Sequence, residues 1–166
     1  VMSEATAIPG NEGLSQADAD ARRIALFQPY HDRIRQILDQ RARETRPTIL
    51  LAMHSFTPVY AGVKRPWHIG TLYNRDKRLA AILLRLLHAE GDLVAGDNQP
   101  YAASDATDYA IPVHAERRDL IHTGIEIRQD LIADESGQRE WAERLTRVFR
   151  SEGTRLNSSH DVESRM

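Results

Sequence analysis

Two residues of this sequence are suited to hydrolytic chemistry, a histidine and a buried acid. His54 follows the apolar run Ile49–Met53, and Glu126 lies between Ile125 and Ile127. A carboxylate inside an apolar strand must face a polar cavity, an arginine or a metal ion, because a buried unpaired charge is costly. Beside a metal-bound water, such a carboxylate can act first as general base and later as general acid.

Both residues also have a purely structural interpretation. His54 could be a hydrogen-bonded turn histidine, and Glu126 could form an ion pair with Arg128 or Arg75. A single histidine cannot hold zinc, which takes three or four protein ligands. Other histidines that could contribute are His68 in a cleft, His114 in a loop that could close over the site, and His122, for which a structural role is favoured. His31 is expected at the surface.

Polar residues that follow the predicted strands could bind the substrate. Asn74 and Arg75 come directly after one strand, and their side chains could hold a carboxylate by paired hydrogen bonds or polarise a carbonyl. Ligands of open α/β sheets bind at the ends of the strands. We expect four residues near these strand ends, at the rim of the sheet, and therefore assign them to the substrate pocket: Asn74, Arg75, His68 and Tyr101.

The elements that must position these residues follow the order α, β, β, α, β, β, α. This order predicts a layered α/β protein with a mixed, mostly parallel sheet. Ser15 and Asp18 form a capping box at the start of the first helix, and Pro29 should kink or divide that helix. Predicted strands cover Ile49–Met53, Trp67–Tyr73, Leu93–Ala95 and Ile121–Arg128; predicted helices cover about Ser15–Arg43, Lys77–Ala89 and Gln138–Phe149, with a helical turn near Tyr109–Ala115.

Composition excludes several classes of function. The net charge of -2 gives no electrostatic case for binding nucleic acid or an acidic membrane surface. No cysteine is present, so any metal must be held by His, Asp or Glu. No apolar run approaches the roughly 20 residues of a membrane span, and no secretory signal is visible. A cytoplasmic protein with a small-molecule substrate is expected.

The last residues, 151–166, differ from the rest of the chain. They are polar and aperiodic, which predicts a disordered or non-native tail after a domain at residues 1–150. Arg155–His160 and Ser164–Met166 match what constant stretches of a common sequencing adapter would encode. His160 therefore carries no functional weight.

Five segments resemble the N-formylglutamate amidohydrolase family, in the same order and over nearly all of Ile8–Phe149. HSFTPVYAGVKRPWHIGTLYNRD and GIEIRQDLI are the most specific, and PGNEGLS, PYHDRI and GDNQPY add by their order. The resemblance implies a three-layer α/β/α sandwich of the zinc carboxypeptidase and aspartoacylase group. It also implies hydrolysis of N-formylglutamate to glutamate and formate, a step of histidine breakdown.

The resemblance assigns roles to two residues. His54 in HSFTP matches the last zinc-binding histidine of that group, and Glu126 in EIR matches the glutamate that activates the metal-bound water. Family members usually carry an upstream Asp-His-Ala motif with the first zinc ligand and an Asp-x-Asn-Arg motif for the substrate; neither occurs here. We therefore expect a catalytic domain incomplete at the N-terminus, with weak zinc binding and impaired turnover.

Two alternatives remain open from the sequence. The chain could act on a different N-acyl amino acid, because acyl preference depends on the shape of the pocket. It could instead be a non-catalytic α/β binding or scaffold fragment that has lost its metal site.

Overall fold

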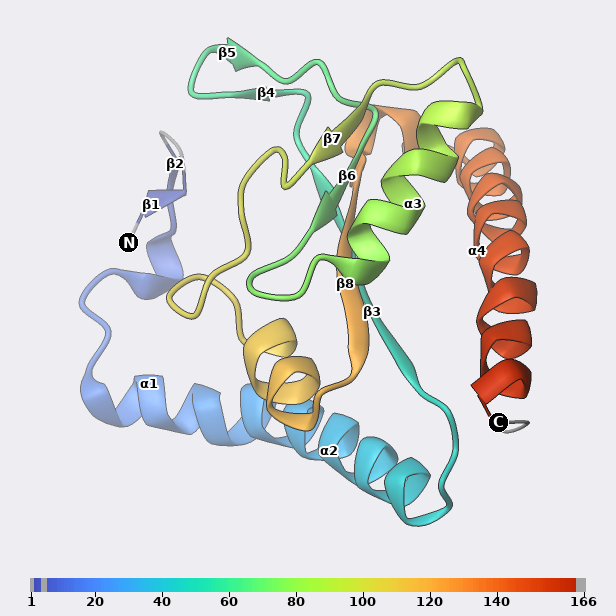
Figure 1. Cartoon of the computed structure of the whole chain (residues 1–166). Coiled ribbons are helices and arrows are strands. Elements are labelled where there is room, and N and C mark those ends of the chain that lie inside the picture. The colour runs from blue at the N-terminus through green and yellow to red at the C-terminus, as the bar shows by residue number, and fades with distance from the viewer. Residues whose placement is uncertain (1, 4–5, 164–166) are drawn as a thin grey trace.

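A four-stranded sheet with the strand order β3-β8-β6-β7 forms the centre of the molecule (Figure 1). The computed structural model describes residues 2–3 and 6–163, and the side chains of residues 7–150. Strand β3 (Ile49–Phe56) pairs in parallel with β8 (Ile121–Arg128). Strand β6 (Ile69–Leu72) is antiparallel to β8 and parallel to β7 (Ala95–Asp97). The predicted mixed, mostly parallel sheet is confirmed.

Helices cover both faces of this sheet, which confirms the layered α/β/α architecture. Helices α3 (Arg78–Ala89) and α4 (Glu135–Glu163) pack on one face. On the other face lie the π-helical turn η3 (Ala110–Ala115) and, beyond it, α2 (Gln28–Arg43). The remaining elements are β1 (Met2–Ser3), β2 (Thr6–Ala7), η1 (Pro9–Asn11), α1 (Gln16–Arg22), η2 (Arg23–Phe27), β4 (Val59–Tyr60), β5 (Val63–Lys64), η4 (Glu116–Arg118) and η5 (Gln129–Ile132).

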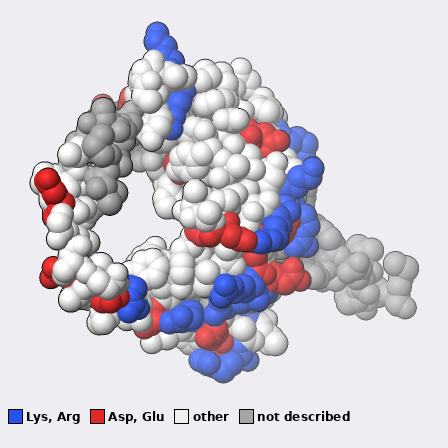
Figure 2. All heavy atoms as spheres, turned by 90° about the vertical axis from the view of Figure 1, so that its left-hand side faces the viewer, with Lys and Arg blue, Asp and Glu red and all other residues white. Residues whose placement is uncertain are grey.

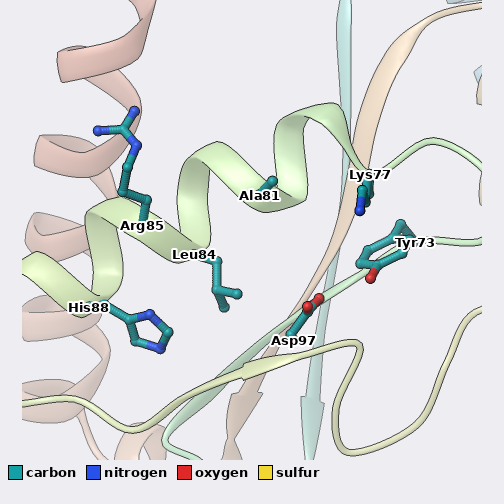
Figure 3. A pocket seen from close by; sticks show the side chains of 7 residues that line it. All are labelled: Tyr73, Lys77, Ala81, Leu84, Arg85, His88 and Asp97. Carbon is teal, nitrogen blue, oxygen red and sulfur yellow. The ribbon is translucent and has the colours of Figure 1, made fainter.

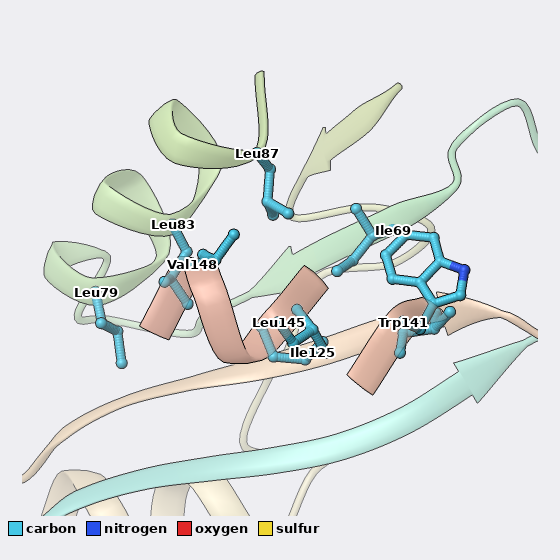
Figure 4. Close-up of a cluster of buried hydrophobic side chains, with 9 residues drawn as sticks. Ile69, Leu79, Leu83, Leu87, Ile125, Trp141, Leu145 and Val148 are labelled. Atoms are coloured by element: carbon cyan, nitrogen blue, oxygen red, sulfur yellow. The ribbon is translucent and has the colours of Figure 1, made fainter. Parts of the chain in front are cut away.

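Alternate residues of β8 serve the two faces of the sheet, because side chains of a strand point in alternating directions. Ile125 and Ile127 join the main apolar core against α3 and α4 (Figure 4). Glu126 and Gly124 face the side of η3, where Ile111 packs with Leu72. The main core thus lies on one face of the sheet, and Glu126 lies on the other. The core side chains are Ile69, Leu79, Leu83, Leu87, Ile125, Ile127, Trp141, Leu145 and Val148.

The first large strand differs from its prediction in length and burial. Strand β3 continues to Phe56, so His54 and Ser55 lie within the strand and not in a polar turn after it. Ile49 is 46% exposed and Met53 is 50% exposed, because no described strand pairs with the outer edge of β3. A continuous apolar run has the same appearance in a central strand and an edge strand, so the sequence could not distinguish them.

The first helix is divided into α1 and α2 by a π-helical turn just before Pro29, where the sequence predicts a kink or a division. Ser15 caps α1 by accepting a hydrogen bond from the Asp18 N–H at 3.1 Å, as predicted. The wider turn η2 then connects α1 to α2, with the N–H of Gln28 donating to the carbonyl of Arg23. In a π-helical turn each N–H bonds the carbonyl five residues earlier, so the hydrogen-bond pattern changes just before the proline. Pro29 lies in the first turn of α2, where a missing N–H costs little.

Helix α4 is longer than predicted and is held by a buried arginine. It continues through Glu163, whereas the sequence predicts no folded element after Arg150. Arg144 binds Asp92 at 2.7 Å and Glu90 at 3.1 Å beyond the end of α3. The side chain of His160 lies outside the described residues, and the proposed domain boundary stays a prediction. None of the described helices is long and apolar enough to cross a membrane.

A pair of histidines joins α2 to η3, which corrects the expectation that His31 is a surface residue. His31 is 8% exposed and His114 is fully buried. Nδ1 of His31 lies 2.8 Å from Nε2 of His114, and Tyr109 packs against both rings. One ring donates this hydrogen bond and the other accepts it, and burial lowers the pKa of His114 to about 4.

The core at Leu83 should dominate stability. Leu83 is 1% exposed between α3 and the sheet, so Leu83→Ala should lower the free energy of unfolding by about 2–5 kcal/mol through lost contacts and an unfilled cavity. Leu26→Ala, at a position that is 71% exposed, is the matched control and should change it by about 0.5 kcal/mol or less. Urea denaturation measures both, and equal losses would contradict the assigned core.

Acid should destabilise the fold through the histidine pair. Besides burial, the charges of His31, Arg35 and Arg118 oppose a proton on His114, so its pKa is lower in the folded chain than in the unfolded one. The unfolded chain then binds more protons between about pH 6.5 and 4, and stability falls as pH decreases through that window. The contribution of His114 should amount to about 1–3 kcal/mol.

The measurement is the free energy of unfolding against pH for the wild type and His114→Gln. The difference between them should shrink as pH falls from about 7 to about 4, because only the wild type has this proton to take up. His88→Gln removes an exposed histidine, so its free energy of unfolding should decrease with pH as that of the wild type does. A pH-independent difference between wild type and His114→Gln would refute the assignment.

Candidate active site

His54 and Glu126 meet on the face of the sheet that lies opposite α3 and α4. They are register partners in the parallel pair of β3 and β8, so their side chains project side by side. Both line a cavity of about 280 Å³, together with Tyr101 and Asp108. The structure therefore brings the two residues with the predicted hydrolytic chemistry into one cavity.

Glu126 is buried and incompletely hydrogen-bonded. It is 1% exposed, its Oε1 accepts a hydrogen bond from the Tyr101 hydroxyl, and its Oε2 has no partner among the described residues. Burial raises the pKa of Glu126, while the Tyr101 hydrogen bond and the charges of His54 and Arg65 lower it; burial prevails. A carboxyl group with a raised pKa is suited to both accept and return a proton.

The alternative ion pair of Glu126 does not form. Arg128 binds Asp130 at 2.8 Å, and Arg75 binds Asp105 and Glu116. The carboxylate of Glu126 thus has a hydroxyl for a partner and no direct arginine contact among the described residues. This arrangement favours a role in chemistry over a structural salt bridge.

Two residues near the cavity were not predicted from the sequence. Arg65 lies over the ring of Tyr60 at 4.5 Å and contributes positive charge toward Glu126. Asp108 accepts hydrogen bonds from the Ser104 N–H at 3.0 Å and the Thr107 hydroxyl at 2.9 Å. Asp108 belongs to a long polar loop, and such loops are often functional, so its loop was the only available indication.

Asn74 and Arg75 lie away from this cavity. They follow β6, which runs antiparallel to β8, and Leu72 of β6 is already opposite Gly124. Both residues therefore approach the N-terminal end of β8. There they bind the acidic pair Asp105 and Glu116. Their predicted rim position depended on β6 running parallel to its neighbour, and their role in substrate binding stays a prediction.

The other candidate histidines also lie outside the cavity. Nδ1 of His68 accepts the N–H of Val94 at 2.9 Å and helps join the start of β6 to the segment before β7. His122 is buried with Nδ1 2.8 Å from the carbonyl oxygen of Leu120, and its Nε2 lies 3.9 Å from Glu116. Such contacts agree with the structural role favoured for His122.

Among the further hollows, one of about 610 Å³ is lined by Arg75, Asp105 and Glu116. Another, of about 550 Å³, separates β3 from α2 and reaches both His54 and the pair of His31 and His114. A third, of about 380 Å³, lies outside the sheet between α3 and β7 (Figure 3). It holds none of the predicted site residues, although the hydroxyl of Tyr73 there bonds Asp97. The chemistry therefore points to the cavity at Glu126.

Charges of both signs are interspersed on the surface. Figure 2 shows Lys and Arg side chains next to Asp and Glu side chains over the lower part of one face. On that face neither sign forms an extended field of the kind that attracts a polyanion.

A zinc ion does not have a complete set of ligands here. Among the described residues, no group of three or more His, Asp or Glu side chains lies close enough together to hold a metal ion. His54 supplies one imidazole, and catalytic zinc usually has three protein ligands. The residues present therefore do not fit a closed zinc site, although Oε2 of Glu126 is buried without a hydrogen-bond partner among the described residues.

Comparison with known proteins relates the chain to a family of known activity and to a solved structure. The sequence model of N-formylglutamate amidohydrolase matches residues 1–133. The crystal structure of gene product Atu2144 from Agrobacterium tumefaciens is similar with 38% sequence identity and a TM-score of 0.85. That match covers 93% of this chain and 61% of the other, so this chain spans less than two thirds of its relative. No curated protein sequence matches significantly.

The matched residues include the segments that carry His54, Tyr101 and Glu126. The match and the α/β/α architecture agree with each other over most of the chain. The chain belongs to the N-formylglutamate amidohydrolase family.

Proposed function

We propose that this chain carries the catalytic glutamate of an amidohydrolase that cleaves N-formylglutamate or a related N-acyl amino acid. The observation that carries the proposal is Glu126, a buried acid with one unpartnered oxygen that shares a cavity with His54. Membership of the family supports the reaction type. The cavity of about 280 Å³ suits part of a small substrate.

In the proposed reaction, Glu126 acts as general base and then as general acid. Its carboxylate accepts a proton from water while the water oxygen adds to the formyl carbon. The same proton then goes to the amide nitrogen as the C–N bond breaks, which gives formate and the free amino acid. The raised pKa of Glu126 favours this return of the proton.

Zinc is the proposed cofactor, with His54 as one ligand. When bound, zinc would polarise the scissile carbonyl or activate water. The described residues supply too few ligands for a closed site, so no step is assigned to the ion. We propose that the chain binds zinc weakly and that its turnover is correspondingly low.

The four residues predicted to bind the substrate do not all line the cavity. Tyr101 lines the cavity, whereas Asn74, Arg75 and His68 make other hydrogen bonds outside it. A different acyl group on the substrate remains an alternative, because the shape of the pocket sets that preference. A non-catalytic binding or scaffold role would be favoured if no N-acyl amino acid were hydrolysed.

Glu126→Gln should abolish release of formate from N-formylglutamate. The amide cannot take the proton of water, and general acid–base catalysis contributes about 10²- to 10⁴-fold. The measurement is formate release by the wild-type chain and by Glu126→Gln. Glu135→Gln, at an exposed position on α4, is the matched control and should keep wild-type turnover. Wild-type turnover in Glu126→Gln would exclude this role.

Zinc content should be below one ion per chain after dialysis. One histidine ligand in the described site gives weak binding, since zinc affinity depends on a complete ligand set. Elemental analysis measures the content, and His54→Ala should lower it further while His88→Ala does not. A stoichiometric ion that survives dialysis, together with rapid formate release, would contradict the proposed weakness.

A further inference from the structure

Two glycines leave a bare patch on the sheet face that carries Glu126. Gly70 of β6 is the register partner of both Glu126 on β8 and Gly96 on β7. A Cβ at Gly70 would lie 1.7 Å from the carbonyl oxygen of Gln99, and a Cβ at Gly96 would lie 2.6 Å from the Gln99 Cβ. The backbone of Gln99 therefore rests on a platform, Gly70 and Gly96, that no other residue type would leave open.

The segment that crosses this platform is fastened to β6 beforehand. The N–H of Asn98 donates to the Thr71 carbonyl at 2.9 Å, and its Oδ1 accepts the N–H of Tyr73 at 3.0 Å. Asn98 has a φ of 54°, in the left-handed region that asparagine tolerates better than most residues. Three residues later the segment places the hydroxyl of Tyr101 on Oε1 of Glu126.

This contact makes the two oxygens of Glu126 inequivalent. Oε1 is occupied by the Tyr101 hydroxyl, while Oε2 is buried without a partner among the described residues. A carboxylate with one oxygen held cannot turn freely about its last torsion. The free oxygen is thereby defined as the one that can exchange a proton in the cavity.

We propose that Tyr101 is a positioning residue for Glu126, delivered to it across the platform of Gly70 and Gly96. The proposal rests on the proposed function, in which Glu126 moves the proton. Tyr101 keeps Oε1 occupied so that Oε2 meets the attacking water in a fixed orientation. In this role Tyr101 acts through Glu126, and not through the substrate contact that the sequence predicts for it.

Tyr101→Phe tests this role by removing only the hydroxyl. It should lower kcat for formate release by about 10- to 100-fold and leave KM nearly unchanged, because orientation of the base matters only in the transition state. Tyr73→Phe is the matched control, since its hydroxyl also bonds a carboxylate, Asp97, but lies at the outer hollow. An unchanged kcat in folded Tyr101→Phe would overturn the proposal.

Gly70→Ala tests the platform while keeping the Tyr101 hydroxyl. The added methyl group must displace Gln99, so this variant should show the same loss of kcat as Tyr101→Phe. Gly10→Ala, where the nearest atom to the new Cβ lies 4.0 Å away, is the control for the substitution itself. Wild-type kcat in Gly70→Ala would mean that the platform is not needed; if Gly70→Ala fails to fold, Tyr101→Phe decides.

A spectroscopic measurement separates this proposal from the proposed function. In protein labelled with ¹³C at tyrosine Cζ, NMR should show a slowly exchanging, downfield hydroxyl proton that is lost in Tyr101→Phe. Glu126→Gln should shift it upfield, because a neutral acceptor makes a weaker hydrogen bond. If the wild type releases no formate, the proposed function fails, and this resonance still decides whether Tyr101 holds Glu126. Absence of the resonance, or no shift in Glu126→Gln, would overturn the proposal.

Discussion

Burial of the Glu126 carboxylate is the constraint on which the arrangement of the sheet depends. A buried charge with an unsatisfied oxygen is unfavourable, and its cost must be offset by packing elsewhere in the same strand. Strand β8 achieves this by alternation, with Ile125 and Ile127 in the main core and Glu126 on the opposite face. The apolar contacts with α3 and α4 stabilise the strand, while the carboxyl group of Glu126 faces the cavity on the other side of the sheet.

Tertiary contacts also reduce the free-energy cost of burying the Glu126 carboxylate, without pairing it with an opposite charge. The Tyr101 hydroxyl binds one oxygen, and Arg65 adds positive charge while its guanidinium stacks on Tyr60. Asp108 lies on the same cavity wall and acts in the opposite direction on the pKa of Glu126. The net balance is an acid whose proton affinity is raised above that of an exposed glutamate.

Local patterns predicted the parts of the fold that depend on local physics. The leucine stripe of α3, the Ser15 cap and the alternation around Glu126 are all set by residues near one another in the chain. The direction of β6 is not such a property, because it depends on pairing with β8, about fifty residues later in the numbering. The exposed edge of β3 likewise depends on which strand stands beside it, which no run of apolar residues reveals.

The candidate site was predictable in its two central members and much less so around them. Glu126 stands out because charged groups are rare inside apolar strands, and His54 stands out because it directly follows an apolar run. The hydrogen bond from Tyr101 depends on Gly70 and Gly96, which lie in different strands. Asn74 and Arg75 were expected at the same end of the sheet as Glu126, but β6 runs antiparallel to β8 and carries them to the other end. The prediction that His54 binds zinc rested on the family resemblance, and the described residues do not complete a set of zinc ligands.

The matched register of β3 and β8 limits how the lengths of these segments can vary. Insertion of a single residue into β3 before His54 would turn the imidazole toward α3 and α4, since neighbouring positions of a strand face opposite sides. Insertions in the connection that contains β4 and β5 leave the facing of His54 and Glu126 untouched. Proteins with this sheet can therefore vary in the length of that connection, whereas β3 and β8 must change by substitution alone.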